Sequence, residues 1–258
     1  MADSTTTGNA YPILPLRMGV LFPSQIMPIS VNRAESMAAI EAALASEEKT
    51  LVIITQRDRE KDVPDFADLF NVGTLAVIKR MQRVGDAIHA IVQGDSRVKI
   101  DHGLSRDPYL RAEVVVLSEP SDTSTEVEAL FGETVKLSDR AFHLLQPEAG
   151  TTLSELARNI ASPIRFVYLL GSIFSLGVEK EQSLLEATTQ AEALRVMHDF
   201  LTHEVQVLEL RQQIASQAQT EMSRQQREYF LRQQLEAIQK ELGEEEQIEK
   251  LDTGKLSW

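Results

Sequence analysis

Few residues in this 258-residue chain have the types and spacing that catalysis or metal binding requires. His198 and His203 are five positions apart, about 140° around a helix, so they cannot share one metal ion. The pair Gly171-Ser172 lies in an apolar helical pattern and is not part of a Gly-x-Ser-x-Gly nucleophile turn. Gly254-Lys255-Leu256 lacks the upstream glycine and the hydroxyl residue of a phosphate-binding loop. We therefore predict no catalytic, cofactor-binding or metal-binding residues in this segment.

The chain is acidic, with 39 Asp and Glu residues, 26 Lys and Arg residues and a formal net charge of −13. A field of this sign opposes binding to nucleic acid or to an anionic membrane through charge alone. One basic group could form a nucleic-acid patch, but the acidic field favours a solvated strand face instead: Lys79, Arg80, Arg83, Arg97 and Lys99. The composition therefore argues against nucleic acid and membrane as partners.

Cysteine is absent, which excludes disulfides, thiol nucleophiles and Cys-ligated zinc and fits a reducing compartment. No apolar run approaches the ~18 residues that a membrane span needs. The first ten residues, MADSTTTGNA, lack the basic start and apolar stretch of a signal peptide. We therefore expect a cytoplasmic protein.

Proline and glycine divide the chain into two regions of different architecture. No proline follows Pro163, and neither residue occurs between Val178 and Leu242. The polar stretch Ser118–Ser124 is suited to a linker between the two regions. We predict a disordered start at 1–10, a β-rich domain at 11–118, a helical bundle at 119–188, a long helix at 189–250, and an end at 251–258 that is a truncation point or an artificial addition.

The β-rich region is expected to contain short strands and one helix. The expected strands are Ile13–Arg17, Leu51–Thr55, Val72–Met81, Ala87–Gln93, Ser96–Ile100 and Leu110–Leu117. Gly85 lies between two of them and indicates a hairpin. Pro23 and Pro28 cannot donate to a ladder, so their segment is expected at an edge or in a turn. Arg33–Ser46 has apolar residues at helical spacing. The expected fold is α+β, with a curled sheet or pseudo-barrel preceding the helices.

The helical region has recognisable starts and stops. We expect helices at Thr125–Leu145, Ile164–Leu176 and Ser183–Ala187. Thr152 and Glu155 fit a capping box before a short helix, and Thr189 and Glu192 fit another at the start of the long run.

The long run would extend ~80 Å as one helix, more than a compact domain of this size contains. Its apolar seam is sound at the start and then interrupted by glutamines. Leu231, Leu235, Ile238 and Leu242 begin a new 4-3-4 stripe in a shifted register. We expect an anchored first half and a protruding, exposed second half. The candidate residues for substrate or partner contact are Met222, Tyr229, Phe230, Leu231 and Leu235. Packing of these residues between subunits or onto the bundle is the favoured alternative.

One block is more specific than these patterns. Gln226–Glu244 (QREYFLRQQLEAIQKELGE) resembles the long helix before the ATPase module in the Lon family of ATP-dependent proteases. Ile13–Val31, with its Leu-Pro-Leu-Arg and Phe-Pro elements, resembles the opening of that family. Val72-Gly73-Thr74 and Gly94-x-x-Arg97-Val98 also lie where the family places them. The resemblance extends from about Tyr11 to Gly243.

This resemblance implies a PUA-like β domain, a helical bundle and a long helix that leads to an AAA+ module, which binds ATP and magnesium, and to a Ser-Lys peptidase domain. It implies a non-catalytic segment for substrate recognition and assembly within a homohexamer. The implied partners are unfolded, damaged and selected regulatory proteins, degraded in protein quality control and stress response. A standalone interaction adaptor and a PUA-like RNA-binding protein remain the alternatives.

Overall fold

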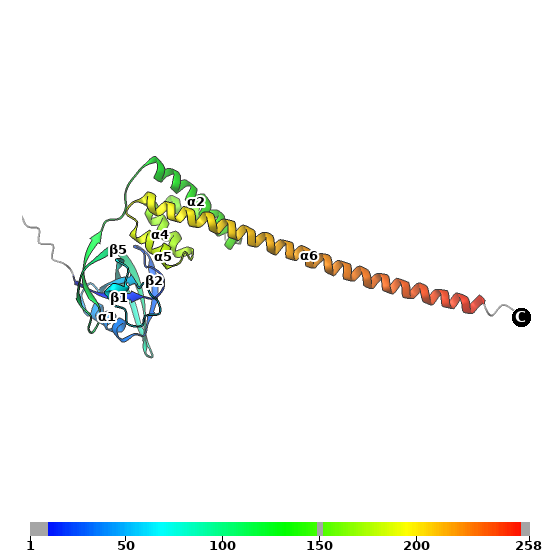
Figure 1. Cartoon of the computed structure of the whole chain (residues 1–258), viewed down its shortest axis with the longest axis horizontal. Helices are drawn as coiled ribbons and strands as arrows, with labels where there is room; N and C mark the ends of the chain where they lie inside the picture. Colours follow the sequence, from blue (N-terminus) through cyan, green and yellow to red (C-terminus); the bar gives the residue numbers. More distant parts are fainter. Residues whose placement is uncertain (1–9, 149–151, 254–258) are drawn as a thin grey trace, which may run out of the picture. The chain divides into compact units, whose positions relative to one another are not determined.

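The computed structural model describes residues 10–148 and 152–253, with side chains to residue 240. The chain forms two compact units, one ending at Val205 and one beginning at Gln206. The expectations for residues 1–9 and 254–258 lie outside the described residues. The first unit contains a β domain and a group of helices (Figure 1).

The β domain is a six-stranded sheet that closes on itself. Its strands are β1 (Ala10–Leu16), β2 (Ile26–Val31), β3 (Thr50–Thr55), β4 (Val72–Val84), β5 (Ala87–Ser105) and β6 (Arg111–Leu117). The order is β2-β5-β4-β3-β1-β6, and β6 also pairs with β5. This second pairing closes a ring of five strands, while β2 lies beside the first half of β5. The expected pseudo-barrel is therefore confirmed.

The barrel is held by two apolar clusters. Helix α1 (Ala34–Ala45) contributes Ile40 and Ala43 to the larger one, which also contains residues of β1 to β5. The smaller one joins β1, β3, β5 and β6 and includes Leu69, which follows the 3₁₀ helix η1 (Phe66–Asp68). The predicted helix, the hairpin at Gly85 and the edge position of Pro28 all agree with the structure.

The structure corrects one prediction in the sheet. The segments Ala87–Gln93 and Ser96–Ile100 are not two strands but parts of β5. The pairing with β4 skips Asp95, so the chain contains a bulge between them. The backbone of Gly94 stays bonded there, because its N–H donates to the carbonyl of Gln25 and its carbonyl accepts from the N–H of Ser24, both at 2.9 Å.

The helices are α2 (Thr125–Leu145), α3 (Leu153–Asn159), α4 (Pro163–Ile173), α5 (Val178–Glu186) and α6 (Gln190–Thr253). Two bounds differ from the predictions, since α4 ends before Leu176 and α5 begins before Ser183. The capping box at Thr152 is wrong, because its side chain makes no cap hydrogen bond and the Ser154 N–H donates to Asp139 at 3.0 Å. Thr189 does accept from the Glu192 N–H at 3.1 Å.

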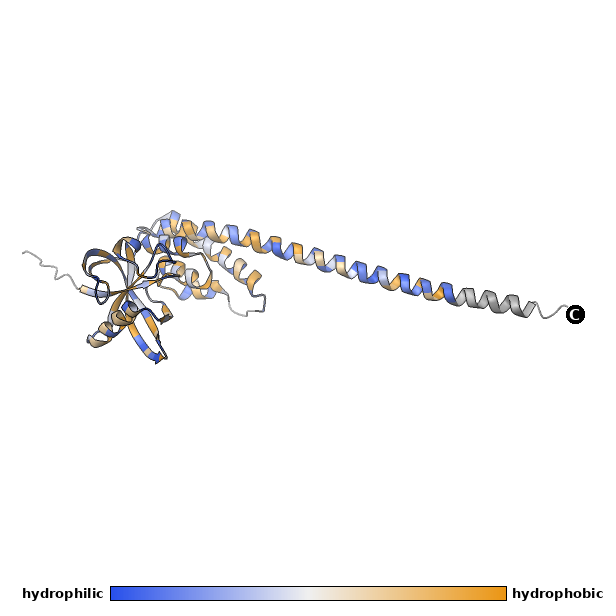
Figure 2. Ribbon diagram, turned by 60° about the horizontal axis from the view of Figure 1, so that its bottom comes forward, coloured by the Kyte–Doolittle hydropathy of each residue, from blue (hydrophilic) through white to orange (hydrophobic). Residues whose placement is uncertain are grey.

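Helix α6 extends from Gln190 to Thr253, so it contributes residues to both units. The α6 side chains that are buried in the first unit include Leu194, Met197, Leu201 and Val205. In the second unit, the large hydrophobic residues between Leu210 and Ile238 are exposed and interspersed with hydrophilic ones (Figure 2). The exposure of its side chains therefore follows the predicted change from an anchored to an exposed half.

Candidate substrate-binding surfaces

The joint between the barrel and the helices is built around Arg97 of β5. Its guanidinium donates to the carbonyl oxygens of Leu185 at 2.8 Å, Ala187 at 2.7 Å and Ser118 at 2.6 Å. Arg97 is 5% exposed, so its prediction as part of a solvated basic face is wrong. The other members of that basic group are exposed: Lys79, Arg80, Arg83 and Lys99.

A second contact at the joint comes from the segment between β1 and β2. The Phe22 ring stacks on Tyr168 of α4 with 4.9 Å between ring centroids. Gly171 permits this contact, since a Cβ there would lie 2.8 Å from the Phe22 ring. Gly171 is therefore a packing position, as predicted. Burial raises the pKa of the Tyr168 hydroxyl to about 12, so the phenol stays protonated at neutral pH.

A groove follows this joint, between residues 17–28 and residues 171–181, and we call it the junction groove. It consists of two adjoining hollows of about 290 and 800 Å³ that share Gly19, Ser175 and Glu181. Met18 and Ile26 are 70% and 64% exposed at its margin. Exposed apolar side chains next to a concave surface are typical of sites that bind apolar segments of other molecules.

Some of the charged groups of the junction groove interact with other parts of the protein. The Glu181 carboxylate accepts from the Val20 N–H at 3.2 Å, and burial raises the pKa of this carboxyl. Arg57 lies 4.6 Å from the centroid of the Phe70 ring and donates to the Leu69 carbonyl. Arg57, Arg59 and Glu179 line the larger hollow and are exposed, so the groove offers a bound segment both apolar and charged surface.

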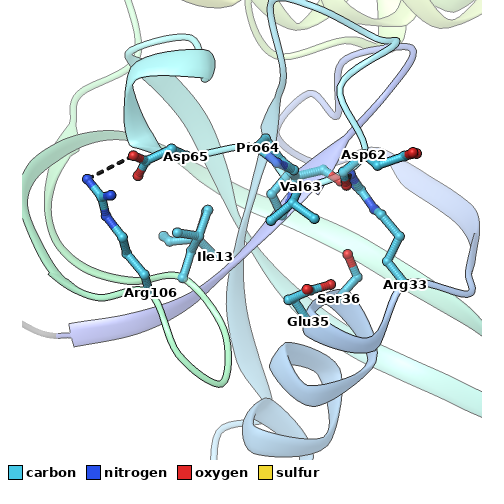
Figure 3. A pocket seen from close by; sticks show the side chains of 11 residues that line it. Ile13, Arg33, Glu35, Ser36, Asp62, Val63, Pro64, Asp65 and Arg106 are labelled. Carbon is cyan, nitrogen blue, oxygen red and sulfur yellow. Dashed lines mark hydrogen bonds and ion pairs between the residues drawn. The ribbon is translucent and has the colours of Figure 1, made fainter.

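A smaller cavity lies on the barrel, between β1, the first turn of α1, residues 62–65 and residues 106–110 (Figure 3). We call it the barrel cavity, and its volume is about 180 Å³. Its apolar lining consists of Ile13, Pro15, Val63, Pro64 and Leu110. An ion pair of 2.8 Å between Arg106 and Asp65 borders it.

The five predicted contact residues on α6 are all exposed: Met222, Tyr229, Phe230, Leu231 and Leu235, at 55–69%. They do not share one face. At about 100° per residue, Met222 and Tyr229 lie on one side of the helix, Leu231 and Leu235 on the other, and Phe230 between them. Their role in binding stays a prediction.

Sequence reasoning did not identify the residues of the junction groove. Met18 and Ile26 are separated from Glu181 by more than 150 positions, and only the folded chain brings their segments together. The one local signal is the apolar segment Gly19–Val31, whose prolines place it outside a central strand.

Neither a metal cluster nor a membrane-spanning helix is found in the described part of the chain. Residues 10–148 and 152–240 contain no group of three or more His, Asp or Glu side chains that could hold a metal ion. No helix in those ranges is long and apolar enough to cross a membrane.

Comparison with known proteins gives the class of this domain. The family model of the ATP-dependent protease La (LON) substrate-binding domain matches residues 10–203. The fold also resembles the N-terminal domain of Mycobacterium avium complex Lon protease, with a TM-score of 0.62 and 26% identity over 75% of this chain and 98% of that one. The Lon N-terminal domain protein from Xanthomonas campestris shares the fold at 16% identity and a TM-score of 0.51, covering 72% of this chain and 95% of that chain. The described fold is therefore that of a substrate-binding domain.

Similarity to full-length relatives gives the family. The chain is 50% identical to the Lon protease of Nitrosococcus oceani over 236 residues. This match covers 92% of this chain and 31% of that protein. It is 34% identical to the Lon protease of Koribacter versatilis, over 95% of this chain and 30% of that protein. The chain therefore belongs to the Lon family and spans about a third of the length of these relatives.

Proposed function

We propose that this domain recognises unfolded and damaged proteins for ATP-dependent degradation in the cytoplasm, and that exposed apolar segments of those proteins bind in the junction groove. The observation that carries the proposal is the pair of exposed apolar side chains, Met18 and Ile26, beside the groove of a Lon substrate-binding domain. Burial of apolar surface has little sequence preference, so one groove can accept many different chains.

The proposal for the whole protein follows the family. ATP and magnesium would bind in an AAA+ module, and a Ser-Lys peptidase domain would cut the substrate. Assembly would be as a homohexamer, and the activity would serve protein quality control and the stress response. Within that protein, this domain would contribute substrate recognition.

The groove can be tested with the double variant Met18→Ser/Ile26→Ser. Both side chains are exposed, so their loss should leave the fold intact. The Kd for reduced, carboxymethylated α-lactalbumin, a permanently unfolded protein, should rise about tenfold, because two apolar contacts are lost. Fluorescence anisotropy at about 150 mM salt, where surface charges are screened, measures this change.

The matched control is Val115→Ser/Val116→Ser, which removes two side chains of β6 that are 52% and 60% exposed. It should leave the Kd unchanged, since these residues do not line the groove. Equal effects of the two double variants would show that binding follows total surface hydrophobicity and would contradict the proposed site.

The α6 residues call for a separate test. Replacing Phe230 and Leu231 with serine should weaken either self-association or binding of the unfolded protein, because both side chains are exposed, at 69% and 56%. The thermal transition of the β domain should not move. Sedimentation velocity and anisotropy would separate the two effects. If both measurements match those of the unaltered chain, these residues have no role in partner contact.

RNA binding is the weaker alternative. Arg97 is buried and engaged at the joint, so one of the five basic residues that could form a patch is unavailable. The net charge of −13 opposes the attraction of RNA by the remaining basic residues.

A further inference from the structure

The larger hollow of the junction groove contains one arginine that lacks an acidic partner. Arg17, Arg57 and Arg59 all line this hollow. Arg17 pairs with Asp62, and Arg59 pairs with Glu60 at 3.1 Å. Arg57 is exposed and forms no ion pair with any residue that the structure describes. Its charge is therefore available to a ligand in the hollow.

The guanidinium of Arg57 is nevertheless held in place. Its Nε donates to the Leu69 carbonyl oxygen at 3.0 Å, and its carbon lies over the Phe70 ring, 4.6 Å from the centroid. The backbone is fixed as well, because the Arg57 N–H donates to the Asp68 carbonyl oxygen at 2.7 Å. An arginine held in this way loses little conformational freedom on binding, and its two Nη groups form a fork of donors that matches a carboxylate.

An apolar contact lies next to this arginine. Two hydrogen bonds of 2.8 and 2.9 Å join residues 16–19 to residues 55–56, and these bonds place the exposed Met18 on the segment beside Arg57. Side chains two positions apart in an extended chain point to the same side. One extended segment in the hollow can therefore place an apolar side chain against Met18 and a carboxylate against Arg57.

The acidic residues of the hollow do not neutralise Arg57. Glu181 is partly buried, and its carboxylate accepts from the Val20 N–H at 3.2 Å. Glu179 is exposed in the first turn of α5 and forms no ion pair with a described residue, so it opposes an incoming carboxylate. The charged lining consists of three basic and two acidic residues, in a chain whose net charge is −13. The hollow is therefore locally basic on an acidic protein, which favours an anionic group there.

We propose that the larger hollow binds a carboxylate of an extended polypeptide through the Nη groups of Arg57, with a neighbouring apolar side chain against Met18. The carboxylate belongs either to an acidic side chain or to the C-terminus of the polypeptide. This inference rests on the proposed function and adds a chemical preference to it. Unfolded segments that combine an apolar residue with a carboxylate should bind more tightly than segments that carry apolar residues alone.

The test uses the full chain and labelled Gly/Ser peptides. Three peptides are blocked at both ends and contain Leu-Ser-Glu, Leu-Ser-Gln or Leu-Ser-Lys, and a fourth ends in Leu-Ser-Gly as a free acid or as its amide. By fluorescence anisotropy at neutral pH and about 150 mM salt, the carboxylate peptide should bind about fivefold more tightly than its uncharged counterpart. A preference for glutamate over glutamine identifies an acidic side chain as the ligand, and a preference for the free acid over its amide identifies a chain end. The lysine peptide should bind no better than the glutamine peptide.

Variants of Arg57 test its role in this preference. Arg57→Met should reduce the affinity ratio between the carboxylate and uncharged peptides to about one, because the guanidinium is lost. Arg57→Lys keeps the charge but not the fork or the Nε bond, so the ratio should fall to about two. If Arg57→Met fails to fold, Arg57→Lys still decides, because an unchanged ratio in that variant would contradict recognition by the fork.

Three further variants separate the site from general charge and from the apolar contact. Arg83→Met is the matched control, since it removes an exposed guanidinium outside the groove and should keep the ratio. Arg59→Met should lower the ratio less than Arg57→Met, because Arg59 already has an acidic partner. Met18→Ser/Ile26→Ser should weaken all peptides alike and keep the ratio.

The outcomes distinguish this inference from the proposed function. An unchanged ratio in Arg57→Met, or an equal fall in Arg59→Met, would overturn the carboxylate site, even if unfolded protein still binds through the apolar part of the groove. Equal affinities for charged and uncharged peptides would overturn it too, as would binding of unfolded protein without binding of any peptide. Failure of the unaltered chain to bind either peptides or unfolded protein would overturn both proposals.

Discussion

The Arg97→Met variant is expected to lose about 3–5 kcal/mol of free energy of unfolding. Arg97 is buried and satisfies three backbone carbonyl oxygens, two at the end of α5 and one in the linker after β6. A methionine side chain fills part of the volume of the arginine but cannot donate hydrogen bonds, so the three carbonyl oxygens would be left without partners. Urea denaturation followed by far-ultraviolet circular dichroism measures the loss.

Two variants serve as controls for Arg97→Met. Arg83→Met removes an exposed guanidinium whose ion pair with Glu41 is long, at 3.5 Å, and it should change stability little. Arg97→Lys keeps the charge but cannot span three acceptors with one ammonium group. Its loss in free energy of unfolding should therefore lie between those of Arg97→Met and Arg83→Met. A loss for Arg97→Met no larger than that for Arg83→Met would mean that the joint does not depend on these hydrogen bonds.

For Gly94→Ala, we expect a loss of about 3 kcal/mol. A Cβ at this position would overlap the backbone carbonyl of Phe22, which cannot move aside as a side chain would. The shift would also disturb the two hydrogen bonds that join Gly94 to Ser24 and Gln25. The same denaturation experiment gives the free energy, and the affinity for unfolded protein should fall with it, because these residues hold the wall of the junction groove.

Gly132→Ala is the matched control. Gly132 lies within α2, and a Cβ there would meet no atom within 4 Å. Alanine should therefore stabilise the chain by about 0.5–1 kcal/mol through its helix propensity. If both alanine variants change stability in the same direction and by similar amounts, the close approach of residues 22 and 94 is not what requires a glycine.

The predictable part of the fold is the part that local chemistry determines. Gly85 between two apolar runs gave the hairpin, and the alanine-rich segment gave α1. The break at Gly94 was wrong because a glycine beside an aspartate can mark a bulge as well as a strand end. Nothing in the sequence distinguishes these two cases, since the distinction depends on the backbone of residues 22–25.

The candidate site was less predictable for a related reason. An arginine on an alternating strand is usually exposed, and only the docking of α5 makes Arg97 a buried donor. The α6 residues were predicted from their apolar types and their position in the second half of the long helix. The structure shows that they are exposed, but not what covers them.

The position of Phe22 has a consequence for selectivity. Its carbonyl is packed on β5 and its ring on α4, so the wall of the junction groove cannot readily adjust to a ligand. With a rigid receptor, the conformational adaptation falls on the incoming chain. A folded protein would have to unfold locally before a segment of it could bind in the groove, whereas a denatured protein already samples extended conformations. Discrimination between native and damaged proteins could thus arise from the stiffness of the groove alone.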